Sequence, residues 1–151
     1  MPDLMSHLLI GLILAELLNT KKKSPVVLGA LMPDLISKIH LVYFYFGFPH
    51  SISFYNFHTP LMAFLLSVLI APLFEYSSLR TVFYFNIGSI SHFLSDLTMK
   101  HFTLTGTPLF FPFLRHGYTL NLVWPEQSIY ILAATLAVYA VIKFTRKRGK
   151  S

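Results

Sequence analysis

The chain has 151 residues, of which 54% are hydrophobic and only 12% are charged. A soluble domain usually carries about 25% charged residues, so this composition argues against a soluble protein. The mean hydropathy of +0.61 excludes intrinsic disorder, and the absence of cysteine excludes disulfides and thiolate ligands. The net charge of +6 arises from short basic clusters between apolar segments, a pattern typical of membrane-flanking charges rather than of nucleic-acid binding.

Five apolar segments follow one another along the chain and predict five helices. Thr59 and Pro60 suit the N-cap and the first helical position of the third segment. None of the segments shows the charged stripe that a helix of a soluble bundle carries. We therefore expect one all-α domain, a polytopic membrane protein with a compact bundle of about five membrane helices. The predicted helices cover residues 4–18, 25–46, 59–74, 81–97 and 128–142.

Residues 98–127 separate the last two segments and predict one long outer loop. They are rich in Pro, Gly, Thr and Phe, and Trp124 suits the headgroup level of a membrane. Loops of this length are more often functional or disordered than idle.

The basic residues predict an orientation in the cytoplasmic membrane. The triple lysine 21–23 follows the first segment, whereas a secretory signal peptide carries its positive charges in front of the apolar region. An outer N-terminus and a cytoplasmic C-terminus place nine basic residues inside and three outside, as the positive-inside rule requires. The three on the outer side are Lys38, Lys100 and Arg115.

Ionisable side chains inside membrane segments are costly, so they are candidates for function. The predicted topology places four of them near the outer face. A fifth lies about midway along the second helix and comes within reach if that helix breaks at Pro33. These candidates are His7, Asp34, His58, His92 and Asp96.

The sharpest local pattern is the spacing of His92 and Asp96. Residues four apart share one face of a helix, where an imidazole and a carboxylate can hold one divalent cation. Zinc accepts both ligand types and keeps an open position for water in catalytic sites. The alternative is a hydrogen-bonded His–Asp pair that seals a polar spot within the membrane.

The other ionisable residues also have structural interpretations. His7 suits a membrane interface, His58 suits the start of the third helix, and Asp34 can pair with Lys38 one turn later. Histidines in outer loops or at helix ends are expected to be solvated, although two of them follow the His/Asp pattern and could join the site. Those two are His101 and His116, and the others are His40 and His50. Glu16 and Glu75 are expected to be ordinary interfacial charges.

Five sequence blocks carry a resemblance to a known family. They are His7-Leu8-Leu9-Ile10-Gly11, Leu31-Met32-Pro33-Asp34, Phe57-His58-Thr59, the block from Gly88 through Ser91-His92 and Asp96 to Thr98, and Gly106-Thr107-Pro108-Leu109-Phe110-Phe111-Pro112. These blocks resemble the YdjM family of small inner-membrane proteins, described as membrane-bound metal-dependent hydrolases. The resemblance covers roughly residues 5 to 115, and the last two blocks are the specific ones.

The resemblance implies a metal site with His7, Asp34, His58, His92 and Asp96 as ligands. Ile36 stands where the family often has a second acidic residue, and residues 53–55 replace an expected His-Arg-Gly, so a site with fewer ligands, or with one metal rather than two, would fit. The ligand order is also similar, more distantly, to that of zinc-dependent phospholipase C and P1 nuclease.

The leading functional prediction is therefore a metal-dependent hydrolase. It would use a divalent metal, zinc in the first place, to activate water against an ester or phosphoester. The substrate would be a membrane lipid or a lipid-linked molecule, and Asp96 or Asp34 would serve as the base. The alternative is a non-catalytic membrane protein, either an ion or metal carrier or a structural module.

Overall fold

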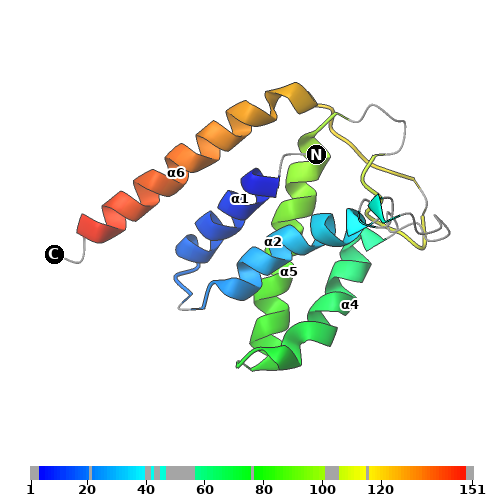
Figure 1. Cartoon of the computed structure of the whole chain (residues 1–151), viewed down its shortest axis with the longest axis horizontal. Coiled ribbons are helices and arrows are strands. Elements are labelled where there is room, and N and C mark those ends of the chain that lie inside the picture. The colour runs from blue at the N-terminus through cyan, green and yellow to red at the C-terminus, as the bar shows by residue number, and fades with distance from the viewer. Residues whose placement is uncertain are drawn as a thin grey trace.

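A computed structural model describes residues 4–20, 22–39, 42, 45–46, 57–75, 77–100, 106–114 and 116–148. Within these ranges the chain is helical, and extended pairing is limited to two isolated bridges, so the predicted all-α class is confirmed. Figure 1 shows α2 crossing α5, with α4 on one side of them and α1 on the other. The helices are α1 (Leu4–Leu17), α2 (Ser24–Ser37), α4 (Pro60–Ile70), α5 (Ser78–Thr98) and α6 (Ser128–Arg148), with short 3-10 helices η2 (Ala71–Leu73) and η3 (Pro125–Gln127).

Helix α2 is shorter than the predicted segment 25–46, because it ends at Ser37. The helix passes through Pro33 without a break, so the early end of the helix, and not a break at Pro33, brings Asp34 within reach of the other candidates. Asp34 consequently lies in the last turn of α2 and not midway along a longer helix. The backbone N–H of Lys38 and the hydroxyl of Ser37 both donate to the carbonyl oxygen of Asp34, each at 3.0 Å, and close this helix end.

The contact between α2 and α5 forms the centre of the fold. Pro33 has no N–H, so the carbonyl oxygen of Gly29 loses its usual helical partner. The hydroxyl of Ser89 on α5 donates to this oxygen at 3.1 Å. A Cβ atom on Gly88 would lie 2.0 Å from the carbonyl oxygen of Val26, which shows that the two backbones touch. Only glycine allows this approach, and it sets the last turns of α5 against the last turns of α2.

Helix α4 begins as predicted at the Thr59-Pro60 pair. The Thr59 side chain accepts a hydrogen bond from the backbone N–H of Met62 at 3.3 Å, and Pro60 occupies the first turn. Further along, the amide of Asn86 on α5 donates to the hydroxyl of Ser67 at 2.9 Å. These contacts fix α4 against α5. His58, the residue before the Thr59 cap, therefore lies at the same end of the molecule as the last turn of α5.

The segment between α5 and η3 covers the C-terminal end of α5. The backbone N–H of Leu120 donates to the carbonyl oxygen of Leu97 at 2.7 Å, and those of Leu122 and Val123 donate to that of Thr98. These bonds satisfy carbonyl groups that a helix end leaves unpaired. The described part of the predicted loop is therefore irregular, as expected, and it is attached directly to α5.

Helix α6 lies along α1 at the edge of the molecule, and none of its residues is buried (Figure 1). Among the described residues, one helical stretch, Pro125–Arg148, is long and apolar enough to cross a membrane. Helix α1 has 14 residues. It therefore rises about 21 Å at 1.5 Å per residue, less than the bilayer core of about 30 Å. Membrane crossing by the shorter helices and the orientation of the termini thus stay predictions.

Glu16 is not the ordinary interfacial charge that was expected. Its side chain is only 4% exposed and lies among three cations from two other parts of the chain. It pairs with Lys23 at the start of α2, with Lys143 at 3.0 Å and with Arg146 at 2.9 Å, both on α6. The carboxylate therefore joins α1, α2 and the C-terminal part of α6.

Candidate metal centre

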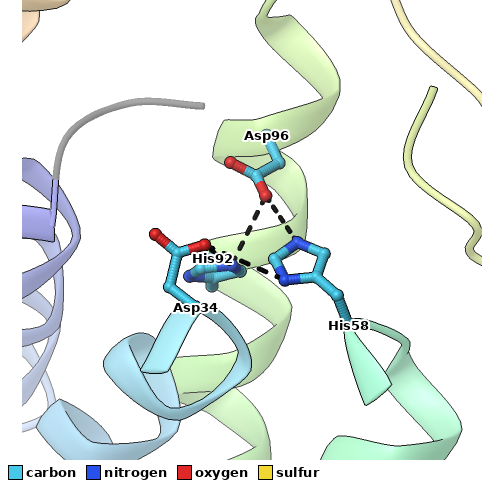
Figure 2. Close-up of side chains that lie close together, drawn as sticks. All are labelled: Asp34, His58, His92 and Asp96. Carbon is cyan, nitrogen blue, oxygen red and sulfur yellow. Dashed lines mark hydrogen bonds and ion pairs between the residues drawn. The ribbon is translucent and has the colours of Figure 1, made fainter. Parts of the chain in front are cut away.

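Five predicted site residues come from four helix ends. His7 lies in the first turn of α1, Asp34 in the last turn of α2, His58 just before the cap of α4, and His92 and Asp96 in the last turns of α5. The alternation of chain direction brings these ends together, and Figure 2 shows four of the side chains facing one another. None of the five is more than 3% exposed.

Asp96 lies at the centre of the cluster and faces three imidazoles. Its Oδ2 atom is 2.8 Å from Nε2 of His58 and 3.4 Å from Nε2 of His92. Its Oδ1 atom is 3.4 Å from Nε2 of His7. The predicted pairing of His92 with Asp96 across one helix turn is therefore present, and two further histidines approach the same carboxylate.

Asp34 lies on the other side of His58 and His92. Its Oδ1 atom is 3.9 Å from Nδ1 of His58 and 3.9 Å from Nε2 of His92. Its Oδ2 atom accepts a hydrogen bond from the ammonium of Lys38 at 2.9 Å. The predicted Asp34–Lys38 pair thus exists beside the cluster, with one carboxylate oxygen turned to the lysine and the other to the histidines.

The tautomer of His92 follows from its backbone contact. Its Nδ1 atom lies 2.8 Å from the carbonyl oxygen of Ala30, which can only accept, so Nδ1 carries the proton. Nε2 then presents its lone pair to Asp34 and Asp96, as a metal-ligating histidine does. The sequence offered no signal for this contact, because the partner is a backbone carbonyl 62 residues away.

The rings themselves are closely packed. The rings of His7 and His92 are stacked with centroids 3.9 Å apart, and the centroids of His58 and His92 are 5.0 Å apart. The ring of Phe93 contacts the ring of His58 with centroids 5.4 Å apart. The packing thus gathers three imidazoles, a ligand type that zinc accepts, in one buried group.

The unpaired atoms of the cluster fit a cation. Buried polar atoms normally have hydrogen-bond partners, and each exception requires an explanation. One ligand atom from each of Asp34, His58, His92 and Asp96 lies within 4.8 Å of the others, so these four residues could hold a metal ion. Ligand atoms in a tetrahedral zinc site are about 3.4 Å apart. The atoms that lack a hydrogen-bond partner among the described residues include His7 Nδ1 and Nε2, Asp34 Oδ1, His58 Nδ1, His92 Nε2 and Asp96 Oδ1.

The other predicted histidines do not join this cluster in the described structure. His116 is exposed, and its ring lies 5.3 Å from that of Tyr118. His40, His50 and His101 lie outside the described residues.

Comparison with known proteins identifies the family. A protein-family model described as "YdjM inner membrane protein" matches residues 1–150. Neither the curated proteins nor the solved structures contain a match, so the likeness to zinc-dependent phospholipase C and P1 nuclease is not shown. The family match includes all five cluster residues and extends through α6. The chain belongs to the YdjM family of inner membrane proteins.

Proposed function

We propose that this protein is a metal-dependent hydrolase of an ester or phosphoester in a membrane lipid or a lipid-linked molecule. The observation that carries the proposal is the buried cluster of three imidazoles and two carboxylates with unpaired atoms directed at one another. Nitrogen and carboxylate donors without thiolates suit zinc. When bound, such an ion supplies a Lewis acid that lowers the pKa of water to about 7. His7, Asp34, His58, His92 and Asp96 are the proposed ligands.

The two carboxylates of the cluster have different surroundings, which support different roles. Asp96 contacts three buried histidines and orients their rings. Asp34 is the carboxylate next to the surface, because its partner Lys38 has a side chain that is 40% exposed. In hydrolysis the water oxygen would bond to the carbonyl carbon or phosphorus as the ester bond breaks, and the proton taken from the water would pass to the leaving oxygen, which departs as the alcohol. We assign the acceptance of the water proton to Asp34, with Asp96 as the alternative base.

An apolar pocket beside the cluster supports a lipid substrate. It has a volume of about 270 Å³ and lies between α2 and α4. Pro33 and Phe57, which line it, immediately precede Asp34 and His58 in the chain. An apolar chain in this pocket would place its polar end next to the cluster. The other lining residues are Ile36, Met62, Ala63, Leu65, Leu66 and Leu69.

The position of the cluster supports an enzyme over a carrier. A transmembrane pathway needs polar groups from one face of the membrane to the other. In the described part of the chain, the possible metal ligands gather in one group at one end of the helices. The opposite end holds Glu16, which already has three cationic partners.

Metal analysis of the detergent-purified protein tests the proposal. We expect one tightly bound divalent ion in the wild type and its loss in His92→Ala, together with loss of hydrolysis of bis(p-nitrophenyl) phosphate or p-nitrophenyl butyrate. His116→Ala is the matched control, since His116 is an exposed histidine outside the cluster. Normal metal content in His92→Ala would contradict the proposed site, and bound metal without any hydrolysis would contradict the proposed activity.

A further inference from the structure

Lys38 borders the cluster and connects the buried carboxylate of Asp34 to the surface of the protein. Its ammonium donates to Asp34 Oδ2 at 2.9 Å, while its side chain is 40% exposed and Asp34 is fully buried. An ammonium carries three N–H donors, and Asp34 accepts one of them. Lys38 can therefore hold the buried carboxylate and an external anion at the same time.

The charge of the site gives the chemical class of that anion. The formal charges of the two carboxylates and of the Lys38 ammonium sum to one negative charge. A divalent cation would change this to one positive charge. In a buried site such a charge is poorly screened, so a ligand with one negative charge is favoured over a neutral one. A phosphodiester carries one negative charge, whereas a carboxylic ester carries none.

We propose that Lys38 is the phosphate-binding residue of the site and that the substrate is a phosphodiester monoanion rather than a neutral carboxylic ester. This inference rests on the proposed function, since it specifies the substrate of the same cluster. Lys38 stands on the exposed side of Asp34, where the phosphate would have to arrive. The apolar pocket lined by Pro33 and Phe57 adjoins the same turn of α2, so a phosphodiester with an apolar chain fits better than a small soluble one.

Binding of dibutyl phosphate and tributyl phosphate to the zinc-loaded protein in detergent tests the inference by calorimetry. Both probes are butyl esters of phosphoric acid, but only dibutyl phosphate is an anion. We expect Lys38→Met to weaken dibutyl phosphate about 10- to 100-fold, as loss of a charged hydrogen bond does. Tributyl phosphate should be unaffected. Lys38→Arg should recover most of the affinity, and Lys22→Met, at the opposite helix ends, should change nothing.

Three further measurements test the contribution of the metal, the contribution of the apolar chains, and the role of Lys38 in the unaltered protein. Removal of zinc should abolish dibutyl phosphate binding, and dimethyl phosphate should bind more weakly than dibutyl phosphate if the ligand is lipid-like. In the unaltered protein, dibutyl phosphate should slow the reaction of Lys38 with an amine acylating reagent, and tributyl phosphate should not. This labelling, followed by mass spectrometry, needs no variant and therefore holds even if Lys38→Met loses its metal.

Three outcomes would overturn the inference. They are unchanged dibutyl phosphate affinity in a zinc-containing Lys38→Met protein, an equal loss for both probes, and no protection of Lys38 from acylation. An equal loss would mean that Lys38 only positions Asp34. If Lys38→Met loses dibutyl phosphate binding but still hydrolyses substrate, the assignment of Lys38 as the phosphate-binding residue is rejected, while the proposed hydrolase activity stands. Anion binding without hydrolysis would support the phosphate site and reject the proposed activity.

Discussion

Two buried carboxylates at opposite helix ends have very different partners. Glu16 is paired with Lys23, Lys143 and Arg146, so its negative charge is fully compensated by the protein. Asp96 faces histidines, and one of its oxygens has no hydrogen-bond partner among the described residues. Both carboxylates are almost inaccessible to water. The first arrangement is complete as it stands, whereas the second has free ligand atoms for a cation.

This contrast separates a structural ion-pair network from a candidate metal site. A buried carboxylate requires a positive partner in either case. At Glu16 the partners are permanent cations that hold α6 against α1. At Asp96 the partners are imidazoles. An imidazole supplies a positive charge only when it is protonated, and otherwise its lone pair can bind a metal ion. Burial alone therefore does not identify the functional carboxylate, but the chemistry of its neighbours does.

The largest expected effect concerns the side of the membrane on which each region lies. The positive-inside rule predicts that the tail after Arg146 is cytoplasmic and that the loop from Gly106 to Arg115 is outside. Reporter fusions at Ser151 and within the loop should give an all-or-none difference. Cytoplasmic reporter activity from the loop fusion would overturn the predicted orientation, and with it the predicted position of the cluster near the outer face.

Substitution of a proposed ligand should remove the metal and the activity together. We expect His92→Ala and Asp96→Asn to lower the hydrolysis rate at least about 1,000-fold, more than the roughly 10- to 100-fold typical of outer-shell residues. The protein should stay folded, because loss of a buried ionisable group relieves a desolvation penalty. Metal content and thermal unfolding are measured on the same preparations.

A purely structural His–Asp pair predicts the reverse of this result. Each substitution would then leave a buried partner unpaired and lower the stability by about 1–3 kcal/mol. Metal content would be equal in the variant and the wild type. A lowered melting temperature at normal metal content would therefore reject the metal site.

Added zinc should stabilise the cluster end of the molecule. A ligand that binds only the folded state contributes about 2.7 kcal/mol at 100 times its dissociation constant. We expect the melting temperature to rise with zinc in the wild type and in Glu16→Gln, but not in His92→Ala. The measurement is a thermal unfolding series in detergent after treatment with a chelator. An equal rise in all three proteins would place the zinc elsewhere.

Glu16→Gln should weaken the opposite end without affecting the metal. It leaves three partly exposed cations around a neutral side chain, and their exposure of 36–50% allows water to compensate in part. We therefore expect a loss of about 1–2 kcal/mol, below that of a fully buried pair. Faster proteolysis of α6 at unchanged metal content would support the assignment. Loss of metal in this variant would show that the two regions are coupled.

Local patterns in the sequence revealed part of this structure. The Thr59-Pro60 pair predicted the start of α4, and the four-residue spacing predicted that His92 and Asp96 share a face. The end of α2 at Ser37 was missed, because no glycine or proline follows it. The partners of Glu16 were also missed, since Lys143 and Arg146 lie far along the chain. Long-range pairs of this kind leave no periodic signal.

The smallest expected effect concerns the contact between α2 and α5, which connects the end that holds Glu16 to the end that holds the cluster. Ser89 donates to the Gly29 carbonyl oxygen that Pro33 leaves without a helical partner. Ser89→Ala should therefore leave a buried acceptor unpaired and lower the stability by about 1 kcal/mol. Ser91→Ala is the control, because the hydroxyl of Ser91 donates within its own helix turn, to the carbonyl oxygen of Gly88 at 2.7 Å. Its loss should be close to zero. Because Gly88 still holds the two backbones together, metal content should stay unchanged in both variants. A larger loss of stability in Ser91→Ala than in Ser89→Ala would mean that another donor pairs with the Gly29 carbonyl oxygen.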